Sequence, residues 1–180
     1  MSAFWDRIGI DETAGTIFDG DRRYLMMRTD VLMGMLHELP AALRGQVLAA
    51  LAESTRQHGG KSVRAYLEAG SSDGLARTVV EGAAAFGWGV WHFSAGAHEA
   101  GLEVENSPFA AGHGPSDVPV CAPIRGIFHS LAQSVLGSDV RVTETQCAAQ
   151  HGGRCRFVAR RAEPSATSLS QTPLSGTPLS

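Results

Sequence analysis

Apolar residues in the first half of the chain recur at the three-to-four-residue spacing of amphipathic helices. Pro40 suits the first turn of one such helix, because the N–H group that proline lacks would have no partner there. The apolar segment before it begins at Thr29 or Asp30, either of which can cap a helix. We therefore expect helices within 31–39, 40–58, 62–69 and 75–86, with a break at Gly59 and Gly60.

Short strands are indicated by alternating apolar and polar positions, which are clearest at 102–106. The stretch 16–27 predicts two strands around a turn, and strands are also expected at 88–93, 140–145 and 156–158. A further helix is expected over 118–136, with Gly137 as its C-cap. Helices lead in the first half and strands pair in the second. We therefore expect an α+β fold, with a helical N-terminal half packed on a small, mostly antiparallel sheet.

The length of 180 residues and the hydrophobic content of 43% favour one globular domain. We expect an N-terminal extension at 1–12, the domain itself at 13–161, and a disordered tail at 162–180. The tail is rich in Ser, Thr and Pro and carries no aromatic residue, so it can bury little apolar surface.

Charge and hydropathy exclude two classes of partner. The net charge of −3 argues against a protein that binds nucleic acid by neutralising phosphates. No stretch approaches the ~18 apolar residues of a membrane span, and the N-terminus does not have the pattern of a secretory signal. We therefore expect a cytoplasmic protein.

Three cysteines in the last third of the chain are the residues with the clearest chemical potential. Cys147 and Cys155 flank a turn built around Gly152 and Gly153, so their thiolates can be aimed at one point. Cys121, at the start of the 118–136 helix, can add a third sulfur. In a reducing compartment such cysteines are better explained as metal ligands or core residues than as disulfides.

A fourth ligand can come from either of two nearby residues. Glu144 lies three residues before Cys147, and His151 lies inside the turn. Three sulfurs with one oxygen or nitrogen suit a tetrahedral zinc ion without an open position. The alternative is that the cysteines are buried as small apolar side chains. A catalytic cysteine is disfavoured, because no histidine and acid accompany it in a recognisable order.

The motif Glu144-Thr-Gln-Cys147, followed by His151-Gly-Gly-Arg-Cys155-Arg-Phe and preceded by Pro-Val-Cys121, resembles the 4-vinyl-reductase (4VR) domain. This domain also forms the sensor half of phenol- and xylene-responsive activators of sigma-factor-dependent transcription, and it occurs in bacteriochlorophyll 4-vinyl reductase-like proteins. The resemblance covers about 13–160. It implies zinc held by Cys121, Glu144, Cys147 and Cys155, and so prefers Glu144 over His151.

The resemblance also carries expectations about architecture. A related fold builds vesicle-tethering complexes, and the sensor domains pair through their N-terminal region and helices. We therefore expect a homodimer in which Phe4 and Trp5 are covered. The activators continue into an ATPase, but the chain has no GxxxxGK[ST] motif, which favours a free-standing sensor-type domain that works with a separate regulator or biosynthetic enzyme.

Aromatic residues beside glycines near 86–93 indicate either ordinary core packing or the wall of a cavity for a flat apolar ligand. With the resemblance, we expect an internal pocket that has His92 or His98 as its polar anchor. Its apolar lining would come from Tyr66, Val79, Phe86, Trp88, Trp91, Phe93 and Phe109.

The favoured function is a zinc-containing sensor or carrier domain that binds an apolar, aromatic or cyclic small molecule. One alternative is a reductase or accessory protein in tetrapyrrole biosynthesis, although no dinucleotide fingerprint or iron–sulfur spacing is present. Another is a dimeric scaffold. We assign no catalytic residue.

Charged residues near the end of the domain are expected to face solvent. Glu103 and Glu105 alternate on one strand face. The arginines at 154, 156, 160 and 161 would form a local basic edge.

Overall fold

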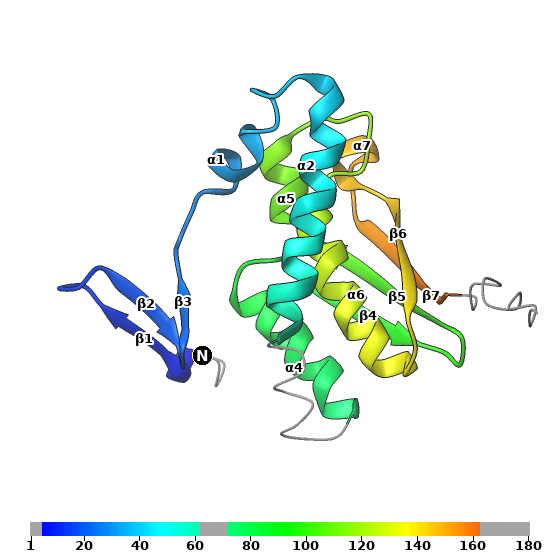
Figure 1. The fold of residues 1–180 in the computed structure, drawn as a ribbon, viewed down its shortest axis with the longest axis horizontal. Coiled ribbons are helices and arrows are strands. Elements are labelled where there is room, and N and C mark those ends of the chain that lie inside the picture. The colour runs from blue at the N-terminus through cyan, green and yellow to red at the C-terminus, as the bar shows by residue number, and fades with distance from the viewer. Residues whose placement is uncertain (1–4, 62–71, 163–180) are drawn as a thin grey trace, which may run out of the picture.

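A four-stranded antiparallel sheet, covered on one face by helices, forms the body of the molecule (Figure 1). The computed structural model describes residues 5–61 and 72–162. The strands, in the spatial order β4-β5-β7-β6, are β4 (Val90–Ala95), β5 (Glu99–Glu105), β7 (Cys155–Arg161) and β6 (Val140–Gln146). All neighbouring strands run antiparallel, and the expected α+β class is confirmed.

Alternation along the strands determines which face of this sheet is buried. In β5, Ala100, Leu102 and Val104 are buried, whereas the residues between them are half-buried. Since side chains alternate along a strand, the buried set shares one face. Helix α6 (Ala122–Leu136) lies against that face and contributes Phe128 and Leu131, both without solvent exposure. The core therefore sits between the sheet and α6.

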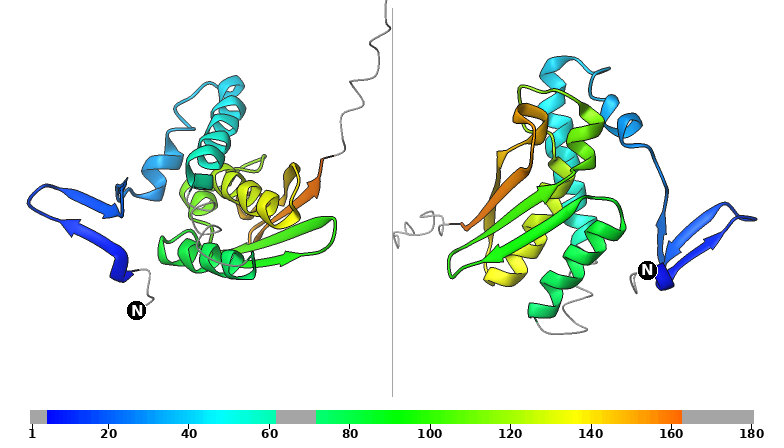
Figure 2. Two further views of the ribbon diagram at one scale, coloured as in Figure 1. Left: turned by 60° about the horizontal axis from the view of Figure 1, so that its bottom comes forward. Right: turned by 180° about the vertical axis from the view of Figure 1, so that it is seen from behind.

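The opposite face of the sheet is open, as the view from behind in Figure 2 shows. Glu103 and Arg156 lie opposite each other on β5 and β7 and form an ion pair of 3.2 Å. Arg154 contacts Glu103 at 3.3 Å and Glu105 at 2.9 Å. These two arginines face solvent as expected, but the prediction that they form a basic edge is wrong, because acidic residues on the neighbouring strand neutralise them. Such exposed pairs add little stability.

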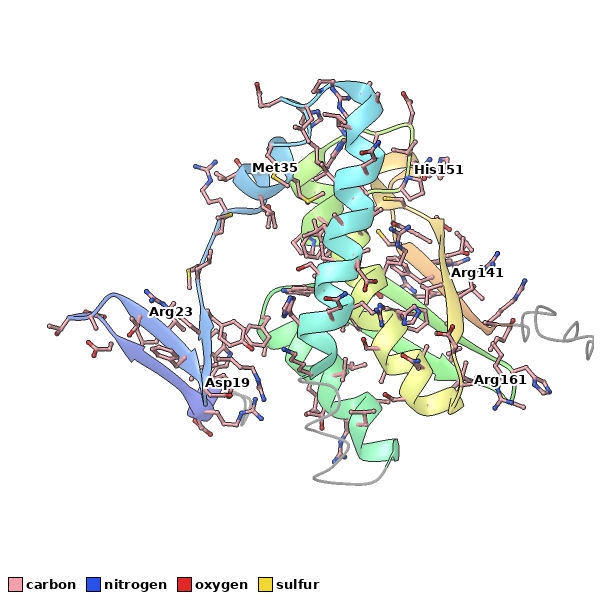
Figure 3. The ribbon with its side chains drawn as sticks, in the orientation of Figure 1. Asp19, Arg23, Met35, Arg141, His151 and Arg161 are labelled. Carbon is pink, nitrogen blue, oxygen red and sulfur yellow. The ribbon has the colours of Figure 1, made fainter. Side chains whose placement is uncertain are left out.

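A second, three-stranded sheet stands beside the body (Figures 1 and 3). It contains β1 (Ile8–Asp11), β2 (Thr16–Asp19) and β3 (Arg22–Tyr24), and it follows the short helix η1 (Trp5–Arg7). The two strands expected within 16–27 are confirmed, and β1 adds part of the expected extension to the same sheet. The buried carboxylate of Asp19 accepts a hydrogen bond from Arg7 at 2.9 Å.

The remaining helices of the described ranges are short or kept close to the body. They are α1 (Thr29–Gly34), α2 (Ala41–Ser54), α4 (Ser72–Ala85), α5 (Pro108–His113) and α7 (Ala148–His151). None of the helices in these ranges is long and apolar enough to cross a bilayer.

Several predicted helix boundaries are corrected by the structure. The apolar segment expected as a helix over 31–39 is helical only as far as Gly34 and continues as turns. Helix α6 begins at Ala122 rather than at 118, although Gly137 caps its end in the left-handed conformation, as expected. The helix expected at 62–69 lies outside the described residues. Helices α5 and α7 were not predicted.

The expected break at Gly59 and Gly60 does not occur. The helix continues as a π-helical turn, η2 (Thr55–Gly59), and residue 60 remains helical. An added Cβ at Gly60 would lie 2.6 Å from the hydroxyl oxygen of Ser130 on α6. An added Cβ at Gly126 would lie 2.2 Å from the carbonyl oxygen of Ala52. These glycines permit close helix packing instead of ending a helix.

We expect Gly126→Ala to destabilise the protein by about 1–3 kcal/mol, because the new methyl group must displace backbone of α2 and η2. Gly45→Ala is the matched control, since an added Cβ at this α2 position meets nothing within 4 Å. That change should stabilise the protein by about 0.5–1 kcal/mol. Urea denaturation of both variants measures the difference, and equal stabilisation by both would refute the close approach.

Candidate functional site

Four side chains from three parts of the chain converge beside the first turn of α6. Cys121 immediately precedes α6, Glu144 lies on β6, Cys147 immediately precedes α7, and Cys155 opens β7. Their sulfur and carboxylate oxygen atoms all lie within 4.8 Å of one another. The three cysteines are fully buried and none forms a disulfide. The structure thus brings together the four residues that the resemblance implies as metal ligands.

Local backbone geometry explains how β6 and β7 present these ligands. A register shift between Glu144 and Gln146 interrupts the pairing of the two strands. Such a bulge changes the direction of nearby side chains. After α7, Gly152 and Gly153 both have positive φ values, of 71° and 73°, which glycine adopts without steric cost. The chain therefore reverses tightly, and Cys155 returns next to Cys147.

The separations of the sulfur atoms fit a shared metal ion. The Sγ atom of Cys121 lies 3.5 Å from that of Cys155 and 3.9 Å from that of Cys147. Both distances far exceed the ~2.05 Å of a disulfide bond. Tetrahedral metal–thiolate bonds of about 2.3 Å place two sulfurs ~3.8 Å apart. The three thiols are thus spaced as ligands of one ion would be.

The carboxylate of Glu144 is held so that one oxygen stays free for an ion. Its Oε2 atom accepts a hydrogen bond of 3.1 Å from the backbone N–H of Cys121. Its Oε1 atom is buried and has no hydrogen-bond partner among the described residues. A buried carboxylate oxygen without a partner is costly, and a bound cation removes that cost.

Burial and mutual contact perturb the acidity of the group in the absence of a cation. Burial, followed by the nearby Cys147, raises the pKa of Glu144 to about 8. Hydrogen bonds from Cys121 and Cys147 lower the pKa of Cys155 to about 3. The same contacts raise the pKa of Cys121. The cluster therefore concentrates its negative charge on one sulfur, and a divalent cation would allow the other ligands to ionise.

His151 does not belong to this group. It lies at the end of α7 and is exposed, as its labelled side chain in Figure 3 shows. The ligand atoms that gather include the carboxylate of Glu144 and not the imidazole. The alternative fourth ligand is therefore disfavoured by position.

Several of the predicted pocket residues do gather between the sheet and the helices. Val79, Trp91 and Phe109 are buried. Trp88 is half-buried and meets Phe109 edge-on, with ring centroids 5.0 Å apart. The indole N–H of Trp91 donates to the backbone carbonyl of Trp88 at 3.1 Å. We call Trp88, Trp91 and Phe109 the aromatic cluster.

Phe93, a further predicted pocket residue, is half-buried. It packs edge-on against the ring of Phe128, with ring centroids 6.3 Å apart. Phe128 is a core residue on α6 that sequence reasoning did not single out. Phe93 therefore belongs to the packing between the sheet and α6.

The other predicted pocket residues lie elsewhere. Phe86 is exposed and stacks on Tyr24 of the three-stranded sheet, with ring centroids 4.9 Å apart. His92 is on the open face of the four-stranded sheet, where it contacts Glu105 at 3.1 Å. His98 is exposed in the connection between β4 and β5. Strand alternation directs His92 away from Trp91, so the two do not line one interior volume. Tyr66 lies outside the described residues.

Two hollows in the described part of the molecule are not lined by the aromatic cluster. One, of about 500 Å³, is lined by Gly15, Ile17, Arg23, Tyr24, Leu25 and Met26. Another, of about 230 Å³ between α2 and α6, is lined by Ala49, Ala52, Glu53, Arg56, Arg125, Gly126 and His129. Both are open to solvent. An interior ligand would therefore have to separate the packed aromatic side chains.

Comparison with known proteins adds a family to this geometry. Residues 101–161 match the model of the 4-vinyl-reductase (4VR) domain. The matched residues include all four candidate metal ligands, and the resemblance expected from the motif is confirmed over this range. A comparison with curated proteins found no match.

Solved structures of low sequence identity are similar to this chain. The phenol-responsive sensory domain of the transcription activator PoxR, solved with phenol, superposes with a TM-score of 0.73 at 16% identity, covering 89% of this chain and 92% of that chain. A vinyl-4-reductase family protein from Methanocaldococcus jannaschii gives 0.47 at 12% identity, covering 78% and 98%. Subunit 3 of a trafficking protein particle complex from Naegleria fowleri, covalently bound to palmitic acid, gives 0.49 at 10% identity, covering 75% and 95%.

Without metal, Glu144→Gln should stabilise the protein as the pH rises. The pKa of Glu144 is raised from 4.5 to about 8, so the folded state retains a proton that the unfolded state releases between these values. The unfolding free energy of the metal-free parent should therefore fall relative to the variant by on the order of 1–2 kcal/mol from about pH 4.5 to about pH 8. Urea titrations in chelator at both pH values measure this. A difference that does not depend on pH would contradict the burial of an ionisable carboxyl group.

Proposed function

We propose that this protein is a zinc-containing domain that binds an apolar, aromatic or cyclic small molecule and acts as a sensor or carrier. The observation that carries the proposal is the buried three-sulfur, one-carboxylate centre, within a fold that superposes on the phenol-responsive sensory domain of PoxR with a TM-score of 0.73. We assign no catalytic residue to it.

Zinc fits the centre because it prefers tetrahedral sets of sulfur, nitrogen and carboxylate ligands. Cys121, Glu144, Cys147 and Cys155 would hold the ion. Four protein ligands close its coordination, so the chemistry that zinc supplies is structural rather than catalytic. The ion would join the start of α6 to the β6–β7 hairpin, and its binding energy would become part of the folding energy.

We expect about one zinc per chain by elemental analysis of protein purified under reducing conditions. Cys155→Ser should lower the zinc content strongly and destabilise the protein, because it removes a buried thiolate from a closed site. His151→Ala is the control and should retain zinc and stability, since His151 is exposed and outside the ligand group. A parent without bound metal, or a Cys155→Ser protein that equals the parent in both respects, would refute the zinc proposal.

The ligand is proposed to bind between the sheet and the helices at the aromatic cluster. Three large rings from β4, from the segment before it and from α5 meet there, and such walls suit flat apolar molecules. Trp88 is the half-buried member and therefore the side chain most easily displaced on entry. Val79, on α4, would form the floor beside Trp91.

Binding should quench tryptophan fluorescence and raise the melting temperature when a panel of phenols, polycyclic aromatics and porphyrins is tested. Trp88→Ala should weaken the affinity by at least about tenfold, because the loss of an aromatic wall costs ~1.4 kcal/mol or more. Trp5→Ala, at a residue that is 45% exposed next to the three-stranded sheet, is the control. A panel that produces neither signal would exclude the binding-domain proposal in favour of a scaffold.

We further propose a homodimer that covers the N-terminal sheet and the segment after it. Ile10, Leu25 and Met26 are 62%, 71% and 84% exposed, although they are large apolar side chains. Contiguous exposed apolar surface of this kind marks interaction sites. Light scattering at tens of micromolar should give the mass of two chains, and Met26→Glu should shift the protein toward monomer. A monomeric parent would rule out the dimer.

A further inference from the structure

Ser107 lies between the candidate metal centre and the first turn of α5. It is 4% exposed and directly precedes Pro108, the first residue of the helix. Its Oγ atom lies 3.1 Å from the Sγ atom of Cys121 and accepts a hydrogen bond of 3.4 Å from the backbone N–H of Ala110. The hydroxyl group therefore contacts a candidate ligand and caps a helix at the same time.

The direction of the contact with sulfur follows from the donor inventory. A serine hydroxyl has one proton to donate and two lone pairs to accept. Because Ala110 N–H occupies a lone pair, the hydroxyl proton remains available for Cys121. A metal-bound cysteine is a thiolate and has no proton of its own. With metal present, Ser107 must be the donor.

The backbone around Ser107 is fixed on the side of β4. Asn106 adopts a positive φ of 56°, which is uncommon for a residue with a side chain. At Gly89 an added Cβ would lie 2.3 Å from the carbonyl oxygen of Glu105 and 3.1 Å from that of Asn106. This close approach sets the corner between β5 and α5, and with it the position of the Ser107 hydroxyl.

The same corner leads into the aromatic cluster. Phe109 follows Ser107 by two residues and packs edge-on against Trp88. On the other side, Val104 pairs in register with Cys155 on β7. The segment from Val104 to Phe109 thus connects a candidate metal ligand with the proposed ligand-binding side chains.

We propose that Ser107 is a positioning residue of the metal centre, which donates a hydrogen bond to the Cys121 thiolate and thereby ties the bound metal to α5 and the aromatic cluster. This inference rests on the proposed metal function. The other donors to the group are backbone N–H groups, of Ala148 to the Cys155 sulfur at 3.3 Å and of Cys121 to Glu144. Ser107 supplies a side-chain donor that substitution can remove.

The test uses the full-length protein with zinc replaced by Co²⁺, whose thiolate charge-transfer absorption reports the electron density on sulfur. Ser107→Ala removes both the donor and the helix cap. Ser107→Gly also removes the donor but keeps most of the capping preference, since glycine costs only a few tenths of a kcal/mol at that position. Ser107→Thr keeps the hydroxyl group. Ser130→Ala is the matched control, because the Ser130 hydroxyl is also buried but donates to the Arg56 carbonyl, away from the metal.

We expect Ser107→Ala and Ser107→Gly to shift the charge-transfer band to lower energy by the same amount, and to weaken metal affinity by about tenfold or more in competition with a chelator. Ser107→Thr should restore the band of the parent, and Ser130→Ala should leave both readouts unchanged. A Ser107→Gly protein with the band and affinity of the parent would overturn the inference, because only the cap would then matter. A parent that takes up no metal would instead overturn the proposed function.

Discussion

The burial of three thiols and one carboxyl group at a single point constrains this structure more than any other interaction. Polar and ionisable groups lose their hydration on burial, and the carboxylate oxygen of Glu144 without a hydrogen-bond partner shows that neighbouring donors among the described residues do not fully replace it. A cation at the centre of the group would compensate all four side chains at once. The local backbone serves this convergence, through the bulge before Gln146 and the left-handed Gly152 and Gly153.

The consequence for the fold is a division of labour between two kinds of restraint. At the first turn of α6, the ligand group holds the helix against the β6–β7 hairpin. Further along, close packing takes over, where Gly126 and Gly60 allow α6 to approach α2 and η2 more closely than any side chain would permit. Helix α6 is thus held against the sheet by chemistry at its start and by shape along its length.

The sequence predicts well what is encoded locally. Alternation located β5, and the spacing of Cys147, Cys155 and the glycines between them located the ligand group. It predicts poorly what depends on a distant partner. Gly60 resembles a helix breaker until α6, distant in the sequence, is packed against it. The arginines of β7 resemble a basic edge until the register with β5 places Glu103 opposite Arg156. Helix α5 has only 6 residues, too few for periodicity to reveal it.

A closed metal centre cannot itself take up a small molecule, so any response to a ligand must pass through packing. The aromatic cluster is placed for this. Phe86, two residues before Trp88, stacks on Tyr24 and so connects the end of α4 to the three-stranded sheet. Gly87 and Gly89, with φ values of 75° and 93°, flank Trp88 in conformations that other residues rarely adopt. A ligand that displaced Trp88 would therefore act on a stiff corner, one end of which contacts the sheet that we propose as the dimer surface.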